Sequence, residues 1–141
     1  MFTGYGSAMA LRWDGVVIDA HDIAALGRWW AETLDYLIVY EAEDELSMSP
    51  RWSSVEPANS LEEFLHNGQG IVFVPVPEGK TVKNRLHLDL APHTSQDRDA
   101  EIARLLERGA TLVDIGQGDV SWTVMADPEG NEFCVLGSRD M

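Results

Sequence analysis

The order of predicted elements repeats once along the chain, and this repeat constrains the fold more than any other feature. In the first half, a short β-branched strand at 15–20 precedes a helix at 23–34, and about three strands follow. In the second half, a strand at 85–91 precedes a helix at 95–108, and again about three strands follow. A duplicated unit of roughly 65 to 70 residues therefore accounts for the chain length of 141 residues.

The two helices carry the clearest local signals. Asp22 is a favourable N-cap residue for the first helix. Apolar residues then recur at helical spacing: Ile23, Leu26, Trp30 and Leu34. We expect Trp29 and Trp30 to lie in the core or in an interface. Gly109 stands where a glycine commonly ends a helix, so it predicts the end of the second helix.

Further strands complete each half. They are predicted at 37–43, 70–77 and 110–116, and two more lie in the hairpin SWTVMADPEGNEFCVLG. Residues 44–69 resist assignment because prolines, serines and acids dominate, apart from a short helical turn at SLEEFLHN. We expect a single domain, with module one at about 14–78 and module two at about 84–138.

Charge and composition narrow the classes of partner. Hydrophobic residues make up 45% of the chain and charged residues 24%, which is typical of a soluble globular protein. The 24 acidic and 10 basic residues give a net charge of −14. This charge disfavours nucleic acid and anionic membranes as partners, because phosphate groups would be repelled, and it is compatible with a cationic ligand.

Cysteine use and the N-terminal residues indicate a cytoplasmic location. Cys134 is the only cysteine, so no disulfide can form within the chain. The N-terminal residues MFTGYGSAMALRW lack a basic region followed by an apolar stretch, so no signal peptide is expected. No apolar run is long enough to predict a transmembrane helix.

The stretch RLHLDL at 85–90 alternates strictly between leucine and polar residues. In a strand, the leucines would share one face, which we expect to pack under a helix. His87 and Asp89 would share the opposite face, and this face requires solvent, a partner or a ligand.

Four stretches resemble the vicinal oxygen chelate superfamily, which includes glyoxalases, extradiol dioxygenases, epimerases and bleomycin resistance proteins. They are DAHDIAALGRWWAETL, NRLHLDL, LLERGATLV and WTVMADPEGNEFCV, and together they span about 14–137. The closest similarity is to small glyoxalase-like bacterial members. The resemblance implies an α+β fold of two βαβββ modules that form an incomplete barrel around a ligand cavity. It also implies a homodimer.

The resemblance also implies a metal site. His87 matches a metal-binding histidine of the superfamily, and Glu132 matches a metal-binding carboxylate, for one divalent ion of Zn, Ni, Mn, Co or Fe. The first module supplies no matching donor. Gly15 or Val17 stands at the histidine position, depending on the alignment, and 70–71 at the carboxylate position.

Other roles for these residues stay open. His87 could instead contact a ligand without metal or serve the structure. Asp19 and Asp89 could face a cationic ligand or pair with a base such as Arg85. Trp122 is predicted to form an aromatic wall for a planar ligand. Cys134 shares a strand face with Glu132, but no base lies near it in the sequence, so we expect a small apolar filler.

Two functional hypotheses follow. In the first, the protein binds and sequesters a small compound, cationic and aromatic, as resistance proteins of the superfamily do. In the second, it is a metal-dependent lyase or isomerase of the glyoxalase type that uses His87 and Glu132. The missing donors of the first module favour sequestration, and the presence of His87 and Glu132 favours catalysis.

Overall fold

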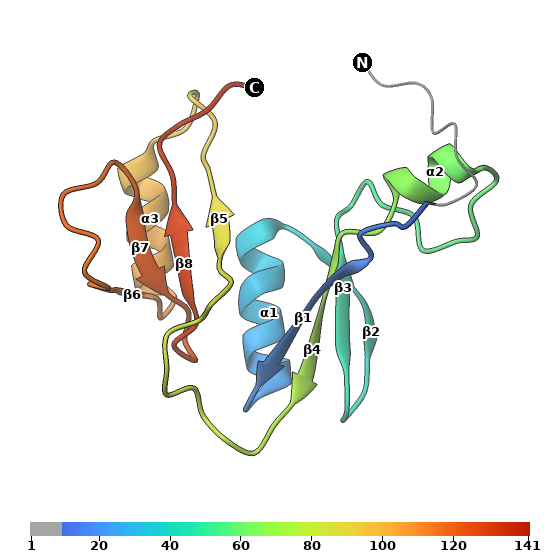
Figure 1. Ribbon diagram of the computed structural model, residues 1–141, viewed down its shortest axis with the longest axis horizontal. Coiled ribbons are helices and arrows are strands. Elements are labelled where there is room, and N and C mark those ends of the chain that lie inside the picture. The colour runs from blue at the N-terminus through green and yellow to red at the C-terminus, as the bar shows by residue number, and fades with distance from the viewer. Residues whose placement is uncertain (1–9) are drawn as a thin grey trace. The chain divides into compact units, whose positions relative to one another are not determined.

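The computed structural model describes residues 10–141, and the chain divides into two compact units, Met1–Pro77 and Glu78–Met141. The prediction about a signal peptide therefore falls mostly on residues outside the described part. Each unit contains one four-stranded sheet, and neither sheet closes on itself (Figure 1). Within residues 10–141, no helix combines the length and apolar character needed to cross a bilayer.

The first unit has the element order β-α-β-β-α-β. Its elements are β1 (Gly15–Ala20), α1 (Ile23–Leu34), β2 (Leu37–Glu41), β3 (Leu46–Ser49), α2 (Leu61–His66) and β4 (Gly70–Pro75). The strands lie in the order β1-β4-β3-β2, with β1 parallel to β4 and the other pairs antiparallel. The long α1 covers one face of this sheet (Figure 1).

The second unit repeats this topology without the short α2. Its elements are β5 (Leu88–Leu90), α3 (Arg98–Glu107), β6 (Thr111–Leu112), β7 (Thr123–Ala126) and β8 (Glu132–Val135). The strands lie in the order β5-β8-β7-β6, and β5 is parallel to β8. The prediction of two tandem βαβββ modules in an α+β fold is therefore confirmed.

The first core forms between α1 and the inner face of its sheet. The Asp22 carboxylate accepts the N–H of Ala25 and caps the helix, as the sequence predicts. Trp30 is 1% exposed, so its expected place in the core is confirmed. Gly27 lets α1 approach the sheet closely, because a Cβ there would lie 2.7 Å from a methyl group of Leu46.

The segment 44–69, which the sequence left unassigned, contains a strand, β3, whose buried Leu46 and Met48 alternate with two serines. One expectation from the sequence is wrong. In RLHLDL only residues 88–90 form a strand, and Leu86 is 85% exposed rather than packed under a helix. Leu86 lies in a bend before β5, where the alternation of a strand no longer directs side chains to fixed faces.

Candidate functional site

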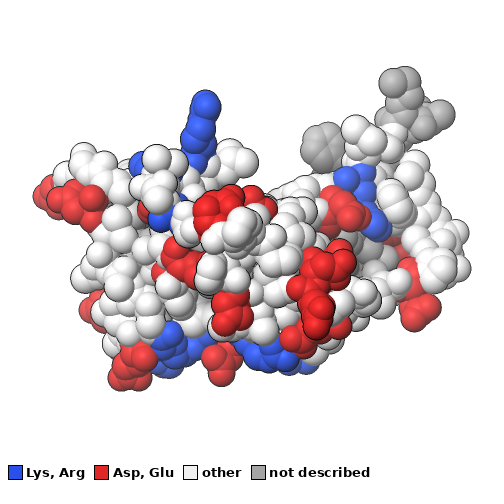
Figure 2. All heavy atoms as spheres, turned by 90° about the horizontal axis from the view of Figure 1, so that it is seen from below, with Lys and Arg blue, Asp and Glu red and all other residues white. Residues whose placement is uncertain are grey.

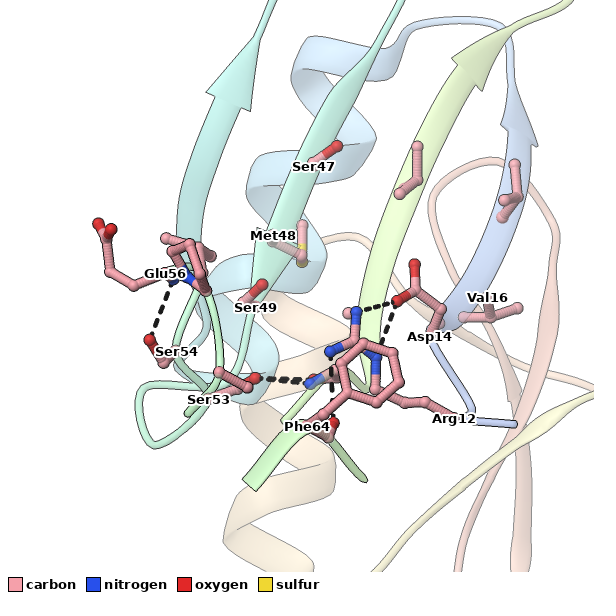
Figure 3. Close-up of a pocket in the computed structure, with 18 of the residues that line it drawn as sticks. Arg12, Asp14, Val16, Ser47, Met48, Ser49, Ser53, Ser54, Glu56 and Phe64 are labelled. Carbon is pink, nitrogen blue, oxygen red and sulfur yellow. Dashed lines mark hydrogen bonds and ion pairs between the residues drawn. The ribbon is translucent and has the colours of Figure 1, made fainter. Parts of the chain in front are cut away.

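A pocket of about 710 Å³ lies in the first unit, on the face of the sheet opposite α1 (Figure 3). Its floor includes residues that alternate along three strands: Gly15 and Val17 of β1, Ser47 and Ser49 of β3, and Gly70 and Val72 of β4. The neighbouring Val16 and Met48 also contribute to the lining, whereas Leu46, Ile71 and Phe73 are buried outside it. The pocket therefore occupies the face that the helix leaves uncovered.

One end of the pocket is formed by the loop at 53–58, which belongs to the segment that the sequence left unassigned. The Ser53 hydroxyl accepts the N–H of Gly68 at 2.9 Å and donates to its carbonyl at 3.0 Å. The buried Asn67 side chain accepts the N–H of Ser54. These bonds attach the loop to residues 67 and 68, just before β4, so the loop forms a wall of the pocket.

Arg12 is the only Lys or Arg in the described lining, and its charge is already compensated. Its guanidinium donates to Asp14 Oδ1 at 2.5 and 3.0 Å, donates to the Phe64 carbonyl at 3.3 Å, and stacks 4.0 Å from the Phe64 ring centre. Figure 3 shows Arg12 held between these two partners. Glu45 also lines the pocket and accepts the Ser47 hydroxyl at 2.8 Å. Within residues 10–141, Glu45 has no Lys or Arg partner within ion-pair distance.

In the second unit, the structure brings His87, Asp89 and Cys134 together. Asp89 and Cys134 are paired across the parallel strands β5 and β8. His87 Nε2 lies 3.2 Å from Asp89 Oδ1, and one donor atom from each of the three residues lies within 4.8 Å of the others. Burial raises the pKa of the Cys134 thiol, and the charge of Asp89 and a hydrogen bond to it raise it further.

Glu132, the other residue expected to bind metal, has different partners. Lys80 Nζ donates to its Oε2 at 2.6 Å, and the N–H of Asn84 donates to its Oε1 at 2.7 Å. Burial opposes ionisation of Glu132, but the bonds from Lys80 and Asn84 outweigh it and keep its pKa below the usual range. Glu132 therefore does not belong to the cluster around His87 among the described residues.

The hairpin DPEGN before β8 is organised by Asp127. This carboxylate is 3% exposed and accepts the backbone N–H groups of Glu129 and Asn131 at 2.9 and 3.0 Å. Gly130 adopts a φ of 90°, which favours glycine. Together these contacts fix where β8 begins and which of its residues share a face.

The two strand ladders correspond when the buried Met48 and Ile71 are matched to the buried Met125 and Phe133. The register then matches the residues of one face as follows: Gly15 with His87, Val17 with Asp89, and Val72 with Cys134. All three first-module residues line the pocket. These three positions carry no metal-binding side chain in the first module. In the second module, the corresponding positions carry three potential metal ligands.

The remaining predicted site residues lie apart from these two features. Asp19 is exposed on β1 and is not part of the pocket lining. Trp122 lies just before β7 and is 41% exposed. The sequence predicts Cys134 to be a small apolar filler, whereas the structure places its thiol beside His87 and Asp89. The alternation of the strand puts it on the same face as Glu132, but its pairing with Asp89 follows only from the strand register.

Carboxylates dominate the surface, as the net charge of −14 requires. Figure 2 shows Asp and Glu side chains spread over the visible face of the molecule, where they cover more area than Lys and Arg. A cationic solute is therefore attracted to the molecule before it reaches any particular site.

The fold and this face of the sheets define a two-module protein of the vicinal oxygen chelate superfamily. The chain belongs to the family described as "Glyoxalase-like domain", whose model matches residues 15–136. Among curated proteins, none matches the chain significantly.

Solved structures share the fold at low sequence identity. A glyoxalase/bleomycin resistance protein/dioxygenase family enzyme from Burkholderia phytofirmans is 15% identical, with a TM-score of 0.64 over 92% of this chain and 100% of that one. The fosfomycin resistance protein FosX from Listeria monocytogenes, in complex with Mn(II) and sulfate, is 10% identical, with a TM-score of 0.65 over 93% of each chain. FosX from Mesorhizobium loti is 12% identical, with a TM-score of 0.61 over 93% of this chain and 95% of that one. At these identities the likeness establishes the fold alone.

Proposed function

We propose that the protein binds a small organic molecule with a positively charged group in the pocket of its first module. The observation that supports this proposal is the character of the lining. A pocket of about 710 Å³ has a single guanidinium, which is already paired with Asp14, and two further carboxylates, Glu45 and Glu56, without a Lys or Arg ion-pair partner among the described residues. This volume falls in the range of pockets that hold drug-sized ligands.

The lining also favours binding over catalysis within this pocket. Its lining, as far as the described residues form it, contains no histidine or cysteine, so no serine there has a histidine base beside it. Serine hydroxyls from β3 and the loop at 53–58 provide hydrogen bonds, and the valines provide apolar contact. Such a surface can recognise a compound and sequester it, as bleomycin-type resistance proteins of the superfamily do.

A pair of dyes tests this proposal. Acridine orange is a planar cation, and fluorescein is an anion of similar size. Fluorescence anisotropy should detect saturable binding of acridine orange and none of fluorescein. Glu45→Gln should weaken binding by roughly tenfold, since it removes a charge from a partly desolvated site. Glu43→Gln, an exposed carboxylate outside the lining, is the matched control. Equal effects of the two variants would contradict binding at this pocket.

A metal-dependent lyase or isomerase is the second candidate, favoured by His87 beside Asp89 and Cys134. The pair His87 and Glu132 does not fit a metal as it stands, because both oxygens of Glu132 are bound by Lys80 and Asn84. Turnover of glyoxalase-type or dioxygenase-type substrates by metal-loaded protein, lost in His87→Ala, would support this candidate. Absence of turnover with every metal tested would argue against it.

A further inference from the structure

We propose that His87, Asp89 and Cys134 form a site for one thiophilic divalent cation of the zinc class. This ligand set differs from the His87–Glu132 pair that the family resemblance implies. It is independent of the proposed pocket ligand, because the three residues belong to the second unit and the pocket to the first.

The backbone positions the three side chains. Asp89 and Cys134 are direct neighbours across the parallel pair β5 and β8. His87 precedes Asp89 by two residues, and the two side chains are already in contact at 3.2 Å. The strands β5 and β8, and His87 directly before β5, thus present all three residues at one place, as a metal site with few ligands requires.

The distances are compatible with coordination. In a tetrahedral zinc site with bonds of about 2.0 Å to nitrogen or oxygen and about 2.3 Å to a single sulfur, donor atoms lie about 3.3–3.5 Å apart. The His87 and Asp89 donor atoms, 3.2 Å apart, are close to this separation, and no donor pair in the cluster exceeds 4.8 Å. The remaining closure is at most about 1.5 Å, which side-chain rotations can supply.

The chemistry of the donors selects the ion. A neutral imidazole, a carboxylate and a thiolate together carry two negative charges, which balance a divalent cation. The thiolate favours Zn²⁺ over oxygen-preferring ions such as Mn²⁺ and Mg²⁺. Cys134 is 6% exposed, whereas the side chains of His87 and Asp89 are 44% and 49% exposed. A fourth coordination position would therefore remain open to water or a ligand.

Neighbouring charged groups do not block the site. Glu132, on the same face of β8, is bound to Lys80 and Asn84 and leaves the ion to the other three residues. Lys83 is the cation whose charge reaches the thiol, but its ammonium donates to the Asn84 carbonyl at 3.1 Å. A purely structural His87–Asp89 contact beside an inert thiol is the alternative that the experiment must separate.

Co²⁺ is the probe, because a thiolate bound to Co²⁺ gives a charge-transfer absorption band. Untagged full-length protein should bind one equivalent of Co²⁺ with this band, and Zn²⁺ should displace it. Cys134 is the only cysteine of the chain, so the band can come only from Co²⁺ bound to the Cys134 thiolate. Cys134→Ser should abolish the band, and His87→Ala and Asp89→Asn should each weaken Co²⁺ binding by roughly tenfold or more.

Two controls distinguish this set from its alternatives. Glu132→Gln should retain the band, whereas a His87–Glu132 site would lose it. His93→Ala removes an exposed histidine of the same unit and should leave the band and the Co²⁺ affinity unchanged. Should Cys134→Ser not fold, X-ray absorption of the Zn²⁺-loaded wild type must show one sulfur ligand. The proposal would be overturned by wild-type protein that shows no Co²⁺ charge-transfer band, or by an X-ray absorption spectrum without a sulfur ligand. Loss of Co²⁺ binding in Glu132→Gln would also overturn it.

Discussion

Lys80 Nζ lies 2.6 Å from Glu132 Oε2, and this ion pair fastens the segment before β5 to the first residue of β8. Both side chains are largely buried, at 18% and 12% exposure. The N–H of Asn84 binds the second carboxylate oxygen. Glu132 is thus a structural link in this chain, and removing either charge would leave the other poorly solvated.

Glu132→Gln and Lys80→Met should each lower the free energy of unfolding, by about 1–3 kcal/mol. The double variant should lose less than the sum of the two, because neither charge is then left without its partner. Urea unfolding of the four proteins measures this coupling. Strictly additive losses would show that the two side chains do not interact in solution.

Gly15 and Gly70 are paired on β1 and β4, and neither position has room for a side chain. A Cβ on Gly15 would lie 2.4 Å from the Gly70 carbonyl oxygen, and a Cβ on Gly70 would lie 2.8 Å from the Met48 carbonyl oxygen. Since both obstacles are backbone atoms of the sheet, Gly15→Ala and Gly70→Ala should each cost about 2 kcal/mol or more.

Thermal denaturation checks this prediction, with Gly79→Ala as the control. A Cβ on Gly79 meets no atom within 4 Å, so this variant should stay within about 0.5 kcal/mol of the wild type. Equal stability of all three variants would contradict the packing described. The same crowding leaves no space for a histidine side chain at Gly15, the first-module position that corresponds to His87 in the strand register.

Asp35 ends α1 with a φ of 55°, and Arg51 donates to both of its carboxylate oxygens at 2.9 and 3.0 Å. These bonds and the charge of Arg51 hold the pKa of Asp35 below its ordinary value. The stabilisation is therefore complete above the unfolded-state pKa of about 3.9 and is lost as the pH falls through the lower folded-state pKa.

Asp35→Asn should consequently be less stable than the wild type at about pH 7, and the difference should narrow towards about pH 3. Asparagine tolerates the left-handed backbone, so the change isolates the charge. Urea unfolding at both pH values measures the difference, with Asp44→Asn, an exposed aspartate, as the reference. A deficit that does not vary with pH would exclude the ion pair as its source.

Local signals were sufficient for much of the fold. The bounds of β1 and α1 follow from β-branched residues, the Asp22 cap and helical spacing, and the structure confirms both. The strand β3 was missed because only two buried residues, Leu46 and Met48, alternate with serines between acidic and proline-rich flanks. In a sequence, so short an alternation cannot be distinguished from the pattern of a polar loop.

The sites depend on contacts that the sequence does not display. His87 and Asp89 could be placed on one face because they lie two residues apart. Their meeting with Cys134 depends on the register of β5 against β8, which long-range packing determines. The pocket wall at 53–58 depends on single hydrogen bonds from Ser53 and Asn67, which have no periodic signature.

Val72 lies on the floor of the pocket, on β4 between the strands β1 and β3. Val72→Phe should fill part of the cavity and weaken acridine orange binding by roughly tenfold or more, through direct exclusion of the dye. Val74→Phe is the matched control, since Val74 lies on the same strand and face but outside the lining.

The two phenylalanine variants should have similar stability, because both residues are only partly buried in the wild type. Fluorescence anisotropy with acridine orange then compares them directly. A loss confined to Val72→Phe would locate the dye on the helix-free face of the first sheet. An equal loss in both, or in neither, would mean that the dye binds elsewhere, and the acidic surface would then be the place to search for it.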